Sequence, residues 1–182
     1  MPTHVQDFAW PDRVVVGTVG RPGARAFYLQ VRMGAQLVSI SLEKEQSALL
    51  AEKIDEVLDE LMASEGNPLG IPAVTPVELV DNDPLDTPVD GWFRTGAMSL
   101  GWDPSTAQVI VEAYPFVEVD DDLPEPEPVE PTDMLLVRMP VGTARAFAKR
   151  TREVVGAGRP LCPLCATPID PDGHTCVIPD RF

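Results

Sequence analysis

The sequence predicts an α+β fold built from two antiparallel βββα-type units and a short cysteine-rich tail. Segments of alternating hydrophobicity come in two groups of three, and a segment of helical periodicity follows each group. The 20 prolines cluster between these segments, as expected of a residue that lacks a backbone donor. The three cysteines lie together near the C-terminus. We therefore expect hairpins with helices covering one face of the sheet.

The first predicted unit covers residues 1–63. Apolar and polar side chains alternate in its strand candidates, which are residues 13–18, 26–32 and 36–42. A helix is expected from about residue 43 to residue 62, because its apolar residues are spaced for one helical face. Ser41 is the expected N-cap, since a serine hydroxyl can accept from a free amide of the first turn.

The second predicted unit covers residues 91–158 and repeats this order. Its strand candidates are residues 92–101, 108–114 and 134–139, and its helix is expected at residues 143–155 with Thr143 as the N-cap. Aligning Leu50 with Phe147 places Val38 on Leu135, Ile40 on Val137, Ala51 on Ala148 and Val57 on Val154. An internal duplication would produce this agreement, and a shared strand–helix period would produce it by chance. Whether the two units form one sheet or two stays open.

Two proline-rich stretches separate these elements. Residues 64–90 are expected to be a long ordered or semi-ordered connection. Residues 118–132 interrupt the second unit as an extended acidic linker, with seven acids between Glu118 and Glu130. Prolines in both stretches argue against a helix or a central strand there.

The tail at residues 159–182 carries the most specific chemical signal. A C-x2-C pair, Cys162 and Cys165, is followed after a Pro-Asp-Gly turn by an H-x-C pair, His174 and Cys176. Zinc prefers four such soft or borderline ligands in a tetrahedron, and four protein ligands make the site structural. A redox pair at Cys162 and Cys165, or unpaired thiols, are the alternatives, but a redox C-x-x-C normally occurs in a βαβ context. We therefore predict a zinc knuckle held by these four side chains.

The charge layout predicts a second feature. The net charge is −15, yet six of the 14 basic residues lie between Arg138 and Arg159. Arg145, Lys149 and Arg152 share one helical face by their spacing. This face is a candidate basic docking surface for an acidic, phosphorylated or nucleic-acid partner. The alternative is a solvated helix face with weak surface pairing.

Catalytic motifs are sparse. The chain has no Gly-rich phosphate loop, no G-x-S-x-G elbow and no H-E-x-x-H helix. His4 is the one histidine outside the predicted knuckle, at an end expected to fray. Two acidic groups, Asp81 with Asp83 and Asp86, and Asp120–Asp122, are candidate ligands for a hard cation. Both groups lie in proline-rich loops, where solvated acids are the commoner explanation, so an enzyme is the less favoured class. The aromatic residues Phe27, Trp92, Phe93 and Phe116 are expected in the core.

The start of the chain from Phe8, the predicted helix at 143–155 and the tail from Cys162 to Cys176 together resemble domain of unknown function family 3090, an uncharacterised actinobacterial family. The resemblance implies a bacterial cytoplasmic protein and, at the metal-type positions, Cys162, Cys165, His174 and Cys176. It implies no activity. The end of this chain, Val177–Phe182, departs from the basic tail of that family.

The leading functional prediction is a non-enzymatic zinc-binding adaptor or regulatory protein with a protein partner. The first alternative is a single-stranded nucleic-acid-binding protein of whirly or Pur type, although the net charge opposes contact with phosphates. The second is an enzyme acting on a phosphorylated small molecule through the face of Arg145, Lys149 and Arg152. No apolar run is long enough to cross a membrane, and no signal peptide is evident, so a cytoplasmic protein without membrane association is expected.

Overall fold

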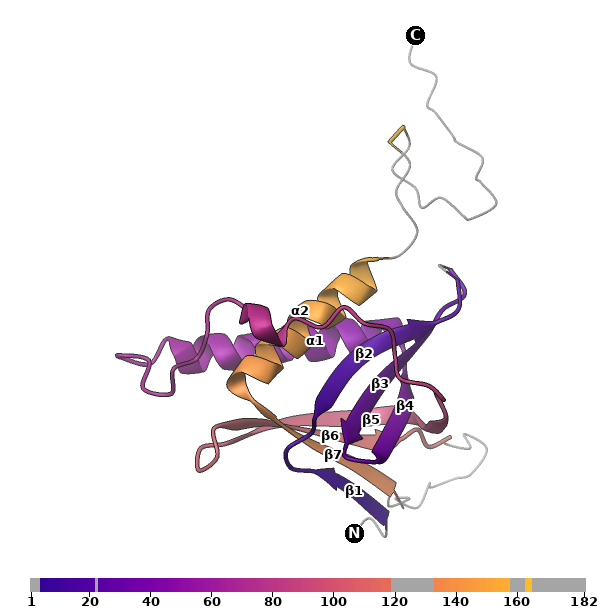
Figure 1. Ribbon diagram of the computed structural model, residues 1–182, viewed down its shortest axis with the longest axis horizontal. Coiled ribbons are helices and arrows are strands. Elements are labelled where there is room, and N and C mark those ends of the chain that lie inside the picture. The colour runs from indigo at the N-terminus through magenta and orange to yellow at the C-terminus, as the bar shows by residue number, and fades with distance from the viewer. Residues whose placement is uncertain (1–3, 22, 119–132, 158–162, 165–182) are drawn as a thin grey trace, which may run out of the picture.

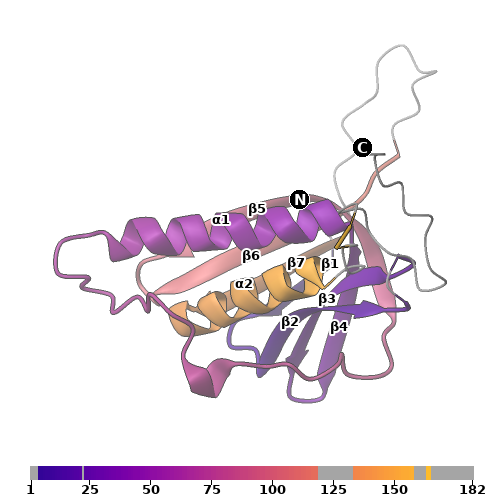
Figure 2. The same ribbon diagram turned by 90° about the horizontal axis from the view of Figure 1, so that it is seen from above.

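The computed structural model describes residues 4–21, 23–118, 133–157 and 163–164. These residues form a seven-stranded sheet in the order β1-β7-β6-β5-β4-β3-β2. Two helices lie side by side over one face of it (Figure 1 and Figure 2). The predicted mixed α+β fold is confirmed, and the described strands of both predicted units belong to a single sheet. Neither helix among the described residues is apolar enough over a sufficient length to span a membrane.

The first half of the fold is an antiparallel meander followed by a helix. Its elements are β2 (Arg13–Val19), β3 (Ala26–Met33), β4 (Gln36–Leu42) and α1 (Lys44–Met62). The predicted N-cap Ser41 is wrong, because Ser41 still belongs to β4. Glu43 is the N-cap, and its backbone N–H donates to Gln46 Oε1 at 2.8 Å. The side chain of Gln46 therefore supplies the cap that the sequence had assigned to a serine.

The second half repeats this order. Its elements are β5 (Gly91–Asp103), β6 (Gln108–Pro115), β7 (Asp133–Pro140) and α2 (Val141–Gly156). The predicted N-cap Thr143 is wrong, because α2 begins two residues earlier, with Pro140 as its N-cap. The predicted acidic linker at 118–132 lies outside the described residues except for Glu118.

Two short elements were not predicted. Strand β1 (His4–Phe8) pairs in parallel with β7, and the 3-10 helix η1 (Val77–Leu79) lies within the 64–90 connection. The expectation that His4 lies at a frayed end is wrong, because His4 is the first residue of β1 and pairs with Asp133. Phe8, at the end of β1, is fully buried. The strand escaped prediction because five residues are too few for a clear alternation.

The sheet is strongly curled. β1 and β2 lie at its opposite edges, yet only residues 9–12 separate them in the chain. An extended chain covers at most about 3.5 Å per residue, so the two edges approach within roughly 17 Å here. Gln108 Nε2 on β6 donates to Ala9 O of this link at 2.8 Å. In Figure 1 the strands β2–β4 run steeply, β5 and β6 run nearly level beneath the helices, and β7 and β1 slope below them.

The core fills the space between the inner face of this sheet and the two helices. Its buried side chains come from both helices and from every strand except β5, whose hydrophobic side chains are partly buried against it. The largest include Phe8, Leu29, Ile40, Ile54, Leu58, Leu135, Met139 and Phe147. In β2 and β3 the inner positions, such as Val16 and Leu29, alternate with outer positions, such as Val15 and Gln30.

The connection between α1 and β5 passes around the β2 edge of the sheet and crosses its outer face (Figure 2). We call residues 80–88 of this connection the strap. Its Leu85 is 9% exposed and packs over Gly17 of β2. Asp86 N donates to Gln30 Oε1 at 2.8 Å, and Gln30 Nε2 donates to Asp86 O at 3.0 Å. The strap thus completes the burial of outer positions on β2 and β3.

Candidate functional site

The predicted zinc ligands Cys162, Cys165, His174 and Cys176 lie outside the described residues. Within the described part of the chain, no group of three or more His, Cys, Asp or Glu side chains is placed to hold a metal ion. The tail follows α2, which ends at Gly156. The buried side chains of Ala144, Phe147 and Ala148 fix α2 in the core.

The predicted basic residues Arg145, Lys149 and Arg152 line one surface between α2, α1 and residues 73–75. A cavity of about 360 Å³ lies at this surface. Two carboxylates of α1, Asp55 and Asp59, lie in the same cavity. We call this the α1–α2 groove.

Arg145 is the structural centre of the α1–α2 groove. Its side chain is 7% exposed, and its Nη1 and Nη2 donate to Asp55 Oδ1 at 2.8 Å and Asp59 Oδ1 at 2.6 Å. Its Nε donates to Pro72 O at 2.8 Å. Burial works to lower the pKa of Arg145, but the hydrogen bonds that it donates to Asp59 and Asp55 outweigh this effect and raise that pKa above its ordinary value. Each of the three guanidinium nitrogens therefore donates to another part of the chain.

The other two cations of the α1–α2 groove also have carboxylate partners. Arg152 pairs with Asp55, and Lys149 pairs with Glu153 of its own helix. Three cations therefore face three carboxylates, and an anionic ligand would have to compete with each pair. The sequence signal for this arrangement was the i, i+4 spacing of Asp55 and Asp59 on α1. As a docking surface, the face of Arg145, Lys149 and Arg152 stays a prediction.

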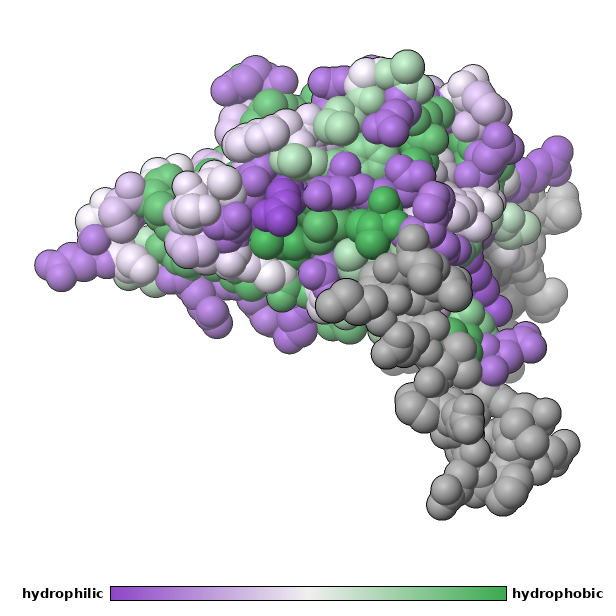
Figure 3. Space-filling model, turned by 90° about the horizontal axis from the view of Figure 1, so that it is seen from below, coloured by the Kyte–Doolittle hydropathy of each residue, from purple (hydrophilic) through white to green (hydrophobic). Residues whose placement is uncertain are grey.

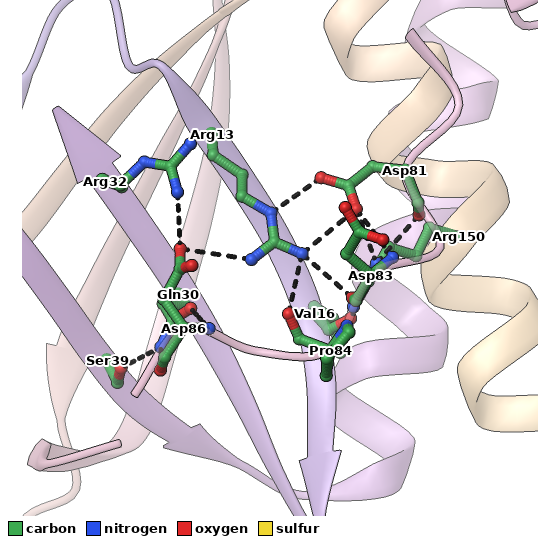
Figure 4. Close-up of polar contacts among 10 residues, drawn as sticks. All are labelled: Arg13, Val16, Gln30, Arg32, Ser39, Asp81, Asp83, Pro84, Asp86 and Arg150. Atoms are coloured by element: carbon green, nitrogen blue, oxygen red, sulfur yellow. Dashed lines mark hydrogen bonds and ion pairs between the residues drawn. The ribbon is translucent and has the colours of Figure 1, made fainter. Parts of the chain in front are cut away.

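A second charged cluster joins the strap to the sheet and to α2 (Figure 4). We call it the arginine clamp; it consists of Arg13, Arg32, Arg150, Asp81 and Asp86. Arg13 Nε donates to Asp81 Oδ2 at 2.7 Å, and its Nη1 donates to Asp86 Oδ2 at 3.2 Å. Arg32 Nη1 donates to the same oxygen of Asp86 at 2.9 Å. The backbone carbonyls of Asp83 and Pro84 accept from Arg13 Nη2.

Arg150 connects the arginine clamp to the exposed edge of the sheet. Its Nε donates to Val16 O of the edge strand β2 at 2.9 Å, and its Nη1 donates to Asp81 O at 2.8 Å. Burial lowers the pKa of Arg150, and the charge of Asp81 partly offsets this effect. The side chain thus covers a β2 carbonyl that would otherwise be open to another chain.

The arginine clamp also changes the interpretation of the acidic residues at 81–86. The hydrogen bond from Arg13 is the main cause that lowers the pKa of Asp81, and the bond to Asp81 is the main cause that raises the pKa of Arg13. Asp81 and Asp86 bind guanidinium groups, so the prediction of a hard-cation site at Asp81, Asp83 and Asp86 is wrong. The other predicted group, Asp120–Asp122, lies outside the described residues.

The family model for "Protein of unknown function (DUF3090)" matches residues 6–176. The chain belongs to this family. The DUF3090 match takes in the described sheet from Gln6, both helices and the tail as far as Cys176, the last of the four predicted zinc ligands. No curated protein and no solved structure matches the chain.

Proposed function

We propose that this DUF3090 chain is a non-enzymatic zinc-binding adaptor, in which the curled-sheet body presents a zinc-bound tail to a protein partner. The observation that carries the proposal is the ligand set itself. Three cysteines and one histidine lie within fifteen residues, as C-x2-C and H-x-C, directly after a helix that is anchored in the core. The family match extends to the last of these ligands.

The physical chemistry of the tail supports a structural zinc ion. A segment this short and rich in proline cannot bury a core of its own. Zinc binding would supply its folding free energy, which is about 10–16 kcal/mol of apparent binding for small zinc modules at neutral pH. Four protein ligands leave no open coordination position, so the ion would hold a surface together rather than activate water.

The body supports a non-enzymatic role. Its most buried ionised groups, Arg13, Arg145 and Arg150, are all bonded to carboxylates or backbone carbonyls that fix secondary elements. The carboxylate of Asp81 is bonded to arginines, and the bond from Arg13 lowers its pKa, which favours the ionised form and not a proton-transferring one.

We further interpret the body as a duplicated βββα unit, and the strand registers support this. Equivalent inner residues pair in the same way in both halves: Val14 with Val31 and Val16 with Leu29 in one, Met98 with Ala113 and Leu100 with Val111 in the other. β1 pairs in parallel with β7, and in the same way the start of β5 pairs in parallel with β4. Strands β1 and β2 together therefore correspond to the single long strand β5. The aligned pairs Leu50 and Phe147, and Ala51 and Ala148, are all buried.

A single-stranded nucleic-acid-binding function fits these surfaces less well. Most of the described arginines already pair with carboxylates, so few are left to displace counterions from phosphates. The underside of the molecule shows hydrophobic and hydrophilic side chains next to one another (Figure 3). A salt-dependent mobility shift with an oligonucleotide would favour this alternative over the adaptor.

Native mass spectrometry of the intact chain tests the zinc site. We expect one zinc ion per chain, and its loss in the variant C162S/C165S with the body still folded. The reason is that the variant keeps only two of the four ligands that a structural zinc ion requires. A purified intact chain without stoichiometric zinc would contradict the proposal.

The partner is tested by comparing three full-length or nearly full-length proteins on the same affinity matrix: the intact chain, C162S/C165S, and the chain truncated after Arg159. Proteins retained by the first and lost from both others would support recognition of the zinc tail. Retention that is equal for all three would refute it.

A further inference from the structure

A polar cavity of about 580 Å³ lies at one end of the sheet, where β3 begins, β4 ends and α1 starts. Its lining includes three basic side chains, Arg25, Lys44 and Arg94. We call it the end cavity. A volume of several hundred cubic ångströms is typical of a small-molecule site. The cavity is separate from the α1–α2 groove and from the arginine clamp, and neither the zinc tail nor the family match assigns it a role.

Two of the three cations of the end cavity, Arg25 and Lys44, differ from most of those elsewhere in the described chain. Nine of the described basic residues have a carboxylate within 4.0 Å, namely Arg13, Arg32, Lys53, Arg94, Arg138, Arg145, Lys149, Arg150 and Arg152. The remaining described ones, Arg21, Arg25 and Lys44, have no carboxylate partner among the described residues. Arg25 and Lys44 line the end cavity, and Arg21 lies in the adjoining turn. In a chain of net charge −15, these cations therefore gather at one place.

A row of hydrogen-bonding side chains crosses three neighbouring strands beside these cations. Tyr28 of β3 pairs with Ser41 of β4, and Ser41 pairs with Arg94 of β5. All three residues line the end cavity. The ring of Tyr28 lies over Gly91 of β5, at an ordinary contact distance of 3.5 Å between Tyr28 Cε1 and the position of a Cβ on that glycine. The hydroxyl groups of Tyr28 and Ser41 thus add neutral donors to a cationic wall.

The two arginines of the end cavity are held by aromatic rings. The Arg94 guanidinium lies 4.7 Å from the centre of the Phe116 ring, and that of Arg25 lies 5.2 Å from the centre of the Phe27 ring. Phe116 was expected in the core, but it is 48% exposed and forms this stack instead. Stacking limits the rotamers of a guanidinium and leaves its in-plane N–H groups free to donate. Arg25 Nη1 donates to Val154 O at 3.4 Å and Arg94 Nη2 lies 3.4 Å from Glu43 Oε1, so the ligand would bind the other N–H groups of each or displace these long contacts.

Two carboxylates, Glu43 and Glu45, also line the end cavity. Glu43 Oε1 is 3.4 Å from Arg94 Nη2, and both side chains of this pair are mostly exposed. Such an exposed pair is weak, so a ligand of higher charge can displace it. The first turn of α1 contributes a small additional positive potential.

We propose that the end cavity binds the phosphate group of a small phosphorylated ligand. A doubly charged phosphate matches two stacked guanidinium groups and one ammonium better than a single carboxylate does. Tyr28 and Ser41 lie where they can donate to the same group or to the part of the ligand next to it. Binding at this site is non-covalent and involves no reaction.

The test is a titration of the full-length protein with inorganic phosphate, followed by amide NMR at constant ionic strength. We expect saturable shifts confined to residues 25–28, 41–46 and 94. Lys44→Met and Arg25→Met should each weaken binding about tenfold, the usual loss for a charge-assisted bond. Glu43→Gln should tighten it, because it removes the competing carboxylate.

The matched control is Lys53→Met, since Lys53 is also an exposed lysine of α1 but lies outside the cavity and pairs with Glu56. Its affinity for phosphate should be that of the wild type. Absence of saturable shifts at the cavity amides, or equal weakening by Lys44→Met and Lys53→Met, would overturn the proposal. The zinc-deficient variant C162S/C165S should still bind phosphate, so this proposal and that of the zinc tail can fail separately.

Discussion

Single side chains decide how the proline-rich connection is fixed to the sheet. Asp81 accepts hydrogen bonds from Arg13 and Arg150, and these two arginines come from β2 and from α2. The side chain of Arg13 is 8% exposed, so loss of its carboxylate partner would leave a nearly buried charge without compensation. One aspartate of the strap therefore joins three parts of the chain that are far apart in sequence.

Asp81→Asn should lower the free energy of unfolding by about 2–3 kcal/mol, because the amide retains the shape but not the charge. Asp83→Asn is the matched control, because Asp83 bonds to the arginine clamp through its backbone carbonyl and N–H, which the substitution retains. Urea denaturation of both variants measures the difference. Equal stabilities for the two variants would show that the charge of Asp81 is not what holds the strap.

The same aspartate predicts a pH dependence. Its pKa is lower in the folded protein than its usual value, chiefly through the bond from Arg13. The stabilisation is therefore complete above the unfolded pKa of about 3.9 and is lost as the pH falls through the lower folded value. The stability difference between wild type and Asp81→Asn should be constant from neutral pH down to that point and shrink below it. Urea denaturation at a series of pH values tests this, and a difference that does not change with pH would contradict it.

At the scale of secondary elements, α1 and α2 are joined by ion pairs as well as by the core. Asp55 of α1 accepts from both Arg145 and Arg152 of α2, but the two arginines differ in burial: their side chains are 7% and 57% exposed. The buried one also binds Asp59 and Pro72 O. Only the buried pair should matter for stability, because solvent screens the exposed one.

Arg145→Met should destabilise the protein by about 3 kcal/mol, since it leaves Asp55 without its buried partner and Pro72 O without a donor. Arg152→Met should change stability by less than about 0.5 kcal/mol. Thermal and urea unfolding of the pair gives this comparison. Any docking experiment on this face should therefore use Lys149 and Arg152, because a change at Arg145 would also affect folding.

At the scale of the whole molecule, the chain encloses strand β2 between α2 on the inner face and the strap on the outer face. The contact that permits this is between Leu85 and Gly17. A Cβ on Gly17 would lie 2.5 Å from Leu85 Cγ and Cδ2. Glycine is required here by the close approach of the strap.

Gly17→Ala should cost about 1–3 kcal/mol, because the added methyl group forces Leu85 and the strap away from the sheet. Leu85→Ala alone should also destabilise, by loss of a buried side chain. The double variant should lose less stability than the sum of the two single losses. The reason is that Leu85→Ala removes the side chain with which the methyl group added by Gly17→Ala would clash. Additive losses in a double-mutant cycle would show that the two residues do not determine how closely the strap packs.

The sequence predicted most of the secondary structure but few of the polar contacts. Six strands and both helices follow from apolar periodicity, which depends on neighbours in the chain. Strand β1 is too short for that signal, and the caps of α1 and α2 depend on Gln46 and Pro140 instead of the hydroxyl groups that local rules favour. Of the candidate sites, the basic face was found on α2, but its carboxylate partners were not.

The amino-acid sequence by itself determined the order of strands and helices, the proline-rich breaks and the spacing of the four predicted zinc ligands, because these are properties of neighbouring residues. Only the tertiary structure decided that the described strands form a single, curled sheet, that the strap crosses its outer face, and which of the described cations have a carboxylate partner. Those outcomes depend on pairs such as Arg13 with Asp81 and Arg145 with Asp55, whose members are far apart in the chain. The curled sheet brings them together, whereas Arg25 and Lys44 of the end cavity have no carboxylate partner among the described residues.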